Sequence, residues 1–515
     1  MTTRYPITLT RRGAISGVGV MTSVAPWALG LMAVAAHAQV PKAGEMTAAD
    51  YPVSERMTRL ATYISQARNR PLPAEVREKT KWHVLDTLAA IVSGSQLPAG
   101  RAAPAFGRSY GGRPVSTVIG DTILLNSIDA AMVNGTMGHA DETDDFEAGP
   151  WHPGINAVPT GLALGEQLRI KGEHFLRAVA LGYDIGARVE LAAGVALNFK
   201  APTNSMGGVF GATATAACVA GLTEQQTRWA LSYAAQQCSG IDSFRRDPDH
   251  IEKGFSNGGM TSRAGVTSAL LVLAGFTAVN DIFSGPANFF DAYADTARPD
   301  LLVEKLGEDF YIASASFKRW PVGGPVQEPM DALQVLLKQR AIDPTQIQEV
   351  LIRQTAGWIT DNSGPLAINV QHAVALMLVD GRLTFRSIHD KSRLKDPRIV
   401  RLKSVMRLVG GPLGQLGQGT DDTPVIQITF ADGTHISQNR VPVRGSQQNP
   451  YTRDWVAEKA RVLMTPVLGA GKTGQLIDHV LKLEDAGSIL ELRPMLQAKA
   501  GPPRLSDWPT GVANP

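Results

Sequence analysis

The sequence is poor in cysteine, in clustered basic residues and in long apolar segments. Only Cys218 and Cys238 occur among its 515 residues, which argues against a disulfide framework or a cysteine-based zinc site. Residues 1–38 contain three arginines and no acidic residue, so the rest of the chain has equal numbers of basic and acidic residues. A neutral body without Lys/Arg runs is not expected to bind nucleic acid. With 44% hydrophobic and 19% charged residues, the composition is that of a globular protein of about two to four domains.

The first 38 residues have the pattern of an export signal. Arg11 and Arg12 precede an uncharged stretch over 13–36, and Ala36-His37-Ala38 is an A-x-A cleavage site. The paired arginines predict a twin-arginine-type signal peptide over 1–38, recognised by the twin-arginine export machinery. We therefore expect cleavage near Ala38 and a periplasmic protein without a membrane segment after cleavage. The alternative is an uncleaved anchor, because the apolar run is about long enough to span a bilayer.

Helical patterns dominate residues 39–310. Ser54 is a candidate N-cap for a first helix, and Pro73 opens a second helix that ends at Gly94. Small-residue patterns typical of helices packed on all sides continue to residue 275. They predict helices over 124–138, 156–167, 173–195, 207–221, 224–237 and 258–275.

The pattern changes after about residue 311. Residues 350–355 and 405–409 are expected to form strands, 326–340 and 369–379 helices, and 425–437 a hairpin around Asp432-Gly433. Helical patterning returns over 449–500, and 501–515 are expected to be a loose tail. The predicted fold class is mainly α with α+β. It has a large all-helical domain, 39–310 joined by 449–500, and a smaller α+β lid domain, 311–448.

The densest group of ionisable residues lies between two of the predicted helices. Seven His, Asp and Glu residues occur between His139 and His152. Adjacent carboxylates orient an imidazole and change its pKa, so this segment is a candidate acid/base site. One alternative is a solvated acidic loop. Another is a Mg²⁺ or Ca²⁺ site, although the spacing is not that of an EF-hand loop and no H-E-x-x-H motif occurs.

Five segments together carry a family resemblance. They are Gly135–His139 with the acidic run after it, His152-Pro153-Gly154, Leu85–Ala90, Phe317–Pro321 and Val379-Asp380-Gly381. In their order and spacing they resemble the MmgE/PrpD family over roughly residues 54–490. The resemblance implies an all-helical domain with an α+β lid, a homodimer, and lyase chemistry on small polycarboxylates without metal or other cofactor.

The resemblance also implies site residues. The site carboxylate of the family falls on Glu142, the acidic pair after it on Asp144 and Asp145, the catalytic His on His152, and the Lys of the Lys-Arg-aromatic-Pro motif on Lys318.

Further residues are expected to complete the site. His139 is a second catalytic imidazole. Lys253, with an uncertainty of about one residue in register, and Arg319, Asp145 and Asn204 are expected to bind substrate. Two histidines of the decarboxylase-like pattern are absent, because Pro202-Thr203-Asn204-Ser205 and Val322-Gly323-Gly324 stand in their places.

The leading hypothesis is a lyase of the hydratase/dehydratase type, resembling 2-methylcitrate dehydratase. It would act on a small hydroxy-polycarboxylate by metal-independent acid/base elimination. Such a reaction needs a base, an acid and cations that stabilise the developing negative charge. The alternatives are an epimerase or isomerase of an acidic substrate and a non-catalytic carboxylate-binding protein. If His152 and Lys318 serve one site, that site lies in the cleft between the two domains.

Overall fold

The computed structural model describes residues 51–147, 151–194, 203–353, 364–409 and 424–498, together with Asn362, Ser506 and Trp508. The chain divides into two units, 1–47 and 48–515, and every described residue belongs to the second. The predicted signal peptide lies outside the described residues. Among the described residues, no helix combines the length and the apolar character needed to cross a bilayer.

The helical domain contains the helices that the sequence predicts. Ser54 caps α1 and accepts a hydrogen bond from Met57 N at 3.2 Å, and α2 follows directly after Pro73. The sequence analysis did not find α3, which begins at Pro98. The helices are α1 (Glu55–Gln66), α2 (Ala74–Gly94), α3 (Pro98–Tyr110), α4 (Ser127–Gly138), α5 (Gly154–Leu168), α6 (Gly172–Ala193), α7 (Thr203–Ala220), α8 (Glu224–Gln236), α9 (Ile251–Gly254), α10 (Met260–Leu273) and α11 (Phe289–Tyr293).

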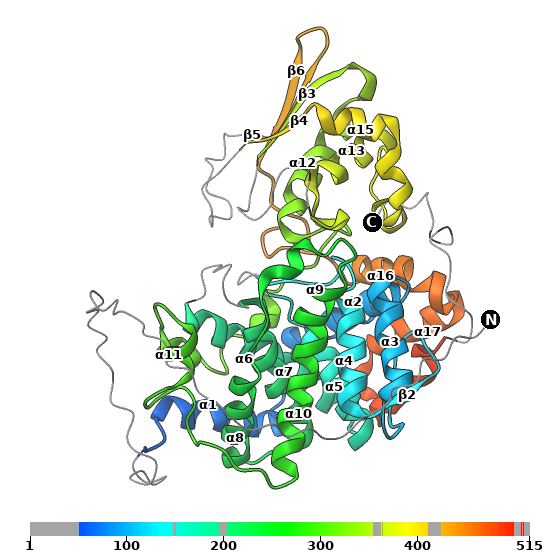
Figure 1. The fold of residues 1–515 in the computed structure, drawn as a ribbon. Helices are drawn as coiled ribbons and strands as arrows, with labels where there is room; N and C mark the ends of the chain where they lie inside the picture. Colours follow the sequence, from blue (N-terminus) through cyan, green and yellow to red (C-terminus); the bar gives the residue numbers. More distant parts are fainter. Residues whose placement is uncertain are drawn as a thin grey trace, which may run out of the picture. The chain divides into compact units, whose positions relative to one another are not determined.

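Close helix packing builds the centre of this domain. Helices α6, α7 and α10 pack together (Figure 1). A Cβ atom on Gly211 of α7 would lie 2.6 Å from the carbonyl oxygen of Gly182 in α6. A Cβ atom on Gly135 of α4 would lie 2.4 Å from Gly258 O. Such short distances exclude any side chain at these crossings.

The end of the chain returns to the helical domain. Helices α16 (Arg453–Leu468) and α17 (Ala470–Val480) follow the lid, and α16 packs against α2 (Figure 1, orange beside blue). Most of the predicted loose tail lies outside the described residues. Trp508, however, is only 2% exposed and lies 5.0 Å from the ring of Phe385. At this position the tail is packed, in contrast to the expectation.

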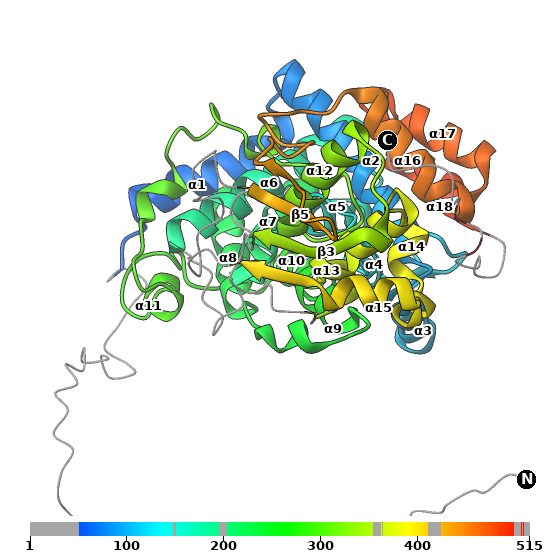
Figure 2. The ribbon, with the colours of Figure 1, turned by 90° about the horizontal axis from the view of Figure 1, so that it is seen from above.

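The lid is an α+β layer with its own hydrophobic core. Its sheet has the order β4-β3-β5-β6, in which β3 and β4 are parallel and the other pairs antiparallel (Figure 2). Val350 and Ile352 of β3 share a buried core with Met330 of α12 and Leu376 of α13. The predicted hairpin is present, and Gly433 in its turn has φ +84°. The elements are α12 (Gly324–Gln339), β3 (Ile347–Arg353), α13 (Val370–Asp380), α14 (Phe385–His389), α15 (Pro397–Ser404), β4 (Met406–Val409), β5 (Pro424–Phe430) and β6 (His435–Asn439). The predicted class, mainly α with an α+β part, is confirmed.

Candidate active site

The acidic segment between α4 and α5 is buried rather than solvated. Its carboxylates, from Asp141 to Glu147, are each at most 5% exposed. The segment is fixed to the beginning of the lid by a pair of backbone hydrogen bonds: Phe146 N donates to Ser316 O at 3.0 Å, and Ser316 N donates to Phe146 O at 2.7 Å. This bridge brings Lys318, two residues further on, beside the acidic segment. The solvated-loop alternative is therefore wrong.

Asp144 is the centre of the cluster. It lies 2.8 Å from His152 Nδ1, 3.2 Å from His139 Nδ1 and 3.1 Å from Lys318 Nζ. Burial alone would raise the pKa of this carboxyl, but Lys318 and the two imidazoles hold it well below its usual range. Asp144 is therefore a carboxylate that orients His152 through one oxygen and holds an ammonium group with the other.

Glu142 anchors the two lysines of the cluster. Lys318 Nζ donates to Glu142 Oε2 at 2.9 Å, Lys253 donates to Glu142 Oε1, and His250 Nε2 lies 3.1 Å from the same oxygen. Burial opposes ionisation of Glu142, but the two ammonium groups hold its pKa well below its ordinary value. Lys318 differs from the expectation, because its side chain has no exposed surface and holds two carboxylates. Its first role is to neutralise them.

An irregular turn places Lys253. Helix α9 runs into a π-helical turn at Phe255–Gly259 before α10 begins at Met260. A π-turn inserts one residue into a helix and is frequent at functional sites. Just before α9, His250 has φ +59°, and its Nδ1 lies 3.0 Å from His139 O. Such a backbone conformation is costly for a residue other than glycine.

The imidazoles of the cluster differ in exposure. His139 is fully buried, and burial lowers its pKa well below the ordinary value. Burial therefore favours its neutral form, and its Nδ1 lies 3.2 Å from Asp144. The cluster consists of seven residues: His139, Glu142, Asp144, His152, His250, Lys253 and Lys318. Among them His152 has the most exposed side chain, at 12%. His152 is thus the most exposed imidazole of the cluster.

Three predicted substrate-binding residues stand apart from this cluster. Asp145 is fully buried, and its carboxylate contacts His83 Nδ1 at 2.6 Å, the Tyr183 hydroxyl at 2.5 Å and Gly154 N at 3.1 Å. Because these protein groups occupy Asp145, it supports the fold instead of binding substrate. Arg319 lies 3.6 Å from Asp331 of α12 and stacks over Trp320, so it belongs to the lid. The side chain of Asn204 lies outside the described part.

Sequence reasoning missed several buried polar residues. His250 lies 108 positions from Glu142 in the sequence, and nothing in the pattern of residues 247–251 connects the two. Lys459 of α16 lies 2.6 Å from Asp86 of α2 and donates to Thr143 O at 2.7 Å. The resemblance around residues 85–90 was the only signal for Asp86. These contacts hold the acidic segment against α16 and, through Lys459, connect it to α2.

Two subsets of the cluster have the geometry of metal ligands. One is His139, Glu142 and His250, and the other is His139, Asp144 and His152, with ligand atoms within 4.8 Å of one another in each. Both carboxylates already face buried ammonium groups. A divalent ion would lie beside Lys253 or Lys318 and would have to overcome their charge. The donor set is therefore poorly suited to a metal ion.

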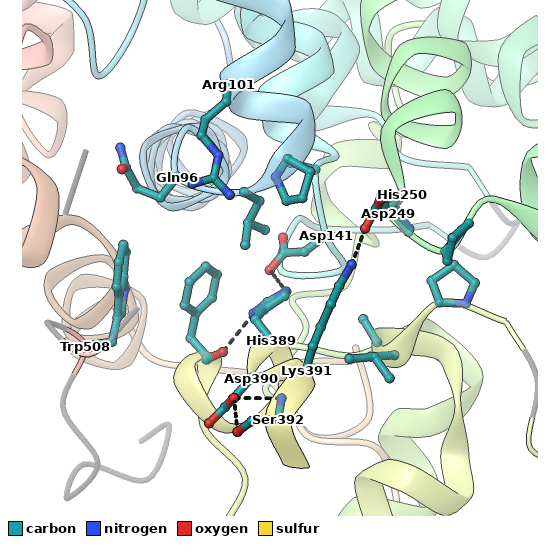
Figure 3. Close-up of a pocket in the computed structure, with 18 residues that line it drawn as sticks. Gln96, Arg101, Asp141, Asp249, His250, His389, Asp390, Lys391, Ser392 and Trp508 are labelled. Atoms are coloured by element: carbon teal, nitrogen blue, oxygen red, sulfur yellow. Dashed lines mark hydrogen bonds and ion pairs between the residues drawn. The ribbon is translucent and has the colours of Figure 1, made fainter. Parts of the chain in front are cut away.

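A pocket lies next to the cluster, between the helical domain and the lid. It has a volume of about 620 Å³ and is lined by Asp141 and His250 from one side and by residues 365–367, 385 and 389–392 from the lid. Figure 3 shows Asp141 facing His389 of the lid, with 3.4 Å between Asp141 Oδ2 and His389 Nε2. His250 belongs to both the pocket and the cluster. The pocket therefore gives a small molecule space beside the cluster.

The fold and the cluster define a two-domain protein with an acid/base site at the junction of its domains. The MmgE/PrpD N-terminal domain model matches residues 58–302, and the MmgE/PrpD C-terminal domain model matches residues 320–485. Together they cover most of the chain, which therefore belongs to the MmgE/PrpD family.

The similarity to individual proteins extends over both domains. The chain is 24% identical to cis-aconitate decarboxylase of Homo sapiens over 481 residues, which cover 87% of this chain and 96% of that protein. It is 23% identical to cis-aconitate decarboxylase of Aspergillus terreus (strain NIH 2624 / FGSC A1156) over 479 residues, 86% of this chain and 96% of that protein. It is 22% identical to the cis-aconitate decarboxylase-like protein oryM of Aspergillus oryzae over 475 residues, 85% and 97% of the two chains.

Proposed function

We propose that this chain is a lyase of the dehydratase/decarboxylase type that acts on a small carboxylic acid by acid/base chemistry. The main observation behind the proposal is that His152 and Lys318 share the carboxylate of Asp144. His152 Nδ1 lies 2.8 Å from this carboxylate and Lys318 Nζ lies 3.1 Å from it, although the two residues come from different domains. A base and a cation held by one carboxylate are what removal of a proton next to a substrate carboxylate requires.

Dehydration of a hydroxy acid is the reaction that fits these residues. His152 removes a proton from the carbon next to a carboxylate, the C–H electron pair forms the double bond, and the C–O bond breaks. The departing hydroxyl takes a proton from Lys253, whose pKa is lowered by burial. His139 stays neutral and positions Asp144 for His152. The ammonium groups stabilise the negative charge that develops on the substrate carboxylate.

Decarboxylation is the second candidate, and the names of the relatives favour it. In that reaction a C–C bond breaks, carbon dioxide leaves, and the carbanion takes up a proton. The same cations and the same proton carriers serve this step. The absence of the two histidines of the decarboxylase-like pattern, at 202–205 and 322–324, counts against decarboxylation, but it also weakens the resemblance to 2-methylcitrate dehydratase.

The experiment is an NMR assay of the purified protein with 2-methylcitrate, citrate and cis-aconitate in deuterated water. We expect water loss from a hydroxy acid, and His152→Ala should abolish it. Release of carbon dioxide from cis-aconitate would show that the reaction is decarboxylation and not dehydration. Deuterium incorporation without loss of water or carbon dioxide would indicate an epimerase. Tight binding without either event would indicate a carboxylate-binding protein.

A further inference from the structure

The pocket beside the cluster is larger than a compact tricarboxylate needs. Its volume of about 620 Å³ lies in the middle of the range of about 300–1,000 Å³ for sites that enclose drug-sized ligands. It reaches the cluster at His250, whose Nε2 lies 3.1 Å from Glu142. A molecule with its carboxylates at the cluster thus has unfilled space next to it.

The charged groups along the lid side of the pocket already have partners. Lys391 pairs with Asp249 across the domain boundary, and Asp390 accepts a hydrogen bond from Ser392 N at 3.0 Å (Figure 3). His389 Nδ1 donates to Phe385 O at 2.7 Å. The ammonium groups of Lys253 and Lys318 lie in the cluster instead, where they pair with Glu142. The pocket therefore does not suit a second compact polyanion.

Apolar side chains supply much of the remaining wall. Leu97 comes from the helical domain, Leu366 and Phe385 from the lid, and Trp508 from the end of the chain. The rings of Phe385 and Trp508 lie 5.0 Å apart with an interplanar angle of 30°. Aromatic and aliphatic surfaces of this kind bind alkyl or aryl groups through burial of apolar area.

Polar groups without partners line the same pocket. The indole Nε1 of Trp508 and the amide Oε1 of Gln96 are buried and make no hydrogen bond to any residue that the structure describes. Arg101 has no ion-pair partner within the described ranges, and its guanidinium group is drawn beside the pocket in Figure 3. A buried donor without a partner costs free energy that a ligand acceptor recovers. The indole N–H of Trp508 is such a buried donor and suits an oxygen atom that accepts hydrogen bonds, whereas Arg101 is exposed to solvent.

We propose that the pocket is an extension of the active site that holds an apolar arm of the substrate, and that this arm ends in an oxygen acceptor. The inference rests on the proposed function, because the carboxylate end is placed at the cluster. It makes the substrate a 2-alkyl- or 2-arylalkyl-substituted hydroxy acid. Citrate and 2-methylcitrate leave the pocket unfilled.

Calorimetry with a series of substituted malates tests the length of the arm. The probes are 2-methylmalate, 2-butylmalate and 2-(4-hydroxybutyl)malate. Each buried methylene is worth ~0.8 kcal/mol, or about fourfold in Kd, so we expect 2-butylmalate to bind at least tenfold more tightly than 2-methylmalate. Ser392→Trp fills the pocket from its exposed rim and should bring the ratio of the Kd values of 2-methylmalate and 2-butylmalate toward one. Ser404→Trp, at the exposed end of α15, is the matched control and should keep it.

The end of the arm is tested with Trp508→Phe, which keeps an aromatic ring, although a smaller one, and removes the indole N–H. The terminal hydroxyl should improve binding about fivefold in the unchanged protein, and this advantage should disappear in Trp508→Phe. Equal affinities for 2-methylmalate and 2-butylmalate, or a ratio that Ser392→Trp leaves intact, would overturn the inference while the proposed function stands. Failure of all three malates to bind would count against the proposed function itself. Thermal unfolding of each variant shows whether it is folded.

Discussion

Replacing Lys318 by Met should destabilise the protein strongly, because Lys318 neutralises two buried carboxylates. Its Nζ lies 2.9 Å from Glu142 and 3.1 Å from Asp144, and its side chain has no exposed surface. Without it, Lys253 is the one ammonium group left beside Glu142 in this cluster, and Asp144 has no lysine partner. Removal of one partner of a buried ion pair costs about 3–5 kcal/mol of unfolding free energy. Urea unfolding followed by circular dichroism measures this loss.

The pH dependence of that loss separates charge from packing. The pKa values of Glu142 and Asp144 are held well below their ordinary values in the native protein. Their stabilising contribution is therefore complete above their unfolded pKa of about 4 and is lost as the pH falls through the lower folded pKa. In Lys318→Met these carboxyls take up protons at higher pH, so the deficit should be largest near pH 7 and shrink toward pH 4.

The control is Lys305→Met, because this lysine is 62% exposed and lies 3.6 Å from the equally exposed Asp309. An exposed pair contributes about 0–1 kcal/mol, so this variant should unfold nearly as the unchanged protein does. A deficit below about 1 kcal/mol for Lys318→Met at pH 7, or one that does not vary with pH, would refute the electrostatic account.

Four further outcomes are expected. His152→Ala should lower the turnover rate by about 10²–10⁴-fold with the fold intact, whereas His435→Ala, on the exposed β6 strand, should leave it unchanged in the same assay. Burial raises the pKa of Glu147 to about 8, so Glu147 favours folding in its protonated form and its contribution declines as the pH rises toward 8. Glu147→Gln should therefore flatten the loss of stability between about pH 4.5 and pH 8 in pH-dependent melts. Prolonged chelation should leave turnover intact. If chelation abolishes turnover and one divalent ion restores it, the cluster is a metal site. Replacement of Arg11 and Arg12 by Lys should retain the protein in the cytoplasm in cell fractionation, and continued export would contradict the twin-arginine signal.

Homodimer formation also stays a prediction, and analytical ultracentrifugation of the purified protein tests it. Sedimentation as a monomer would contradict it.

Short-range patterns predicted much of the fold. The apolar periodicity and the cap at Ser54 define α1, and the alternation around Asp432-Gly433 defines the β5–β6 hairpin. Both depend on interactions between residues close in the sequence, which is why the sequence alone revealed them. Helix α3 was missed because Pro98 and the Gly- and Ala-rich residues after it have no strong helical pattern.

The sequence by itself also located the acidic segment and His152, because many ionisable residues in a short stretch are unusual. The tertiary structure decided what each of them does. Asp144 and Asp145 are adjacent in the sequence, but one faces His152 and Lys318 while the other faces His83 and Tyr183. Which carboxylate serves the site depends on which helices pack against each side of the segment. The contacts of Asp144 and Asp145 are made by residues up to 174 positions away, and no local pattern encodes them.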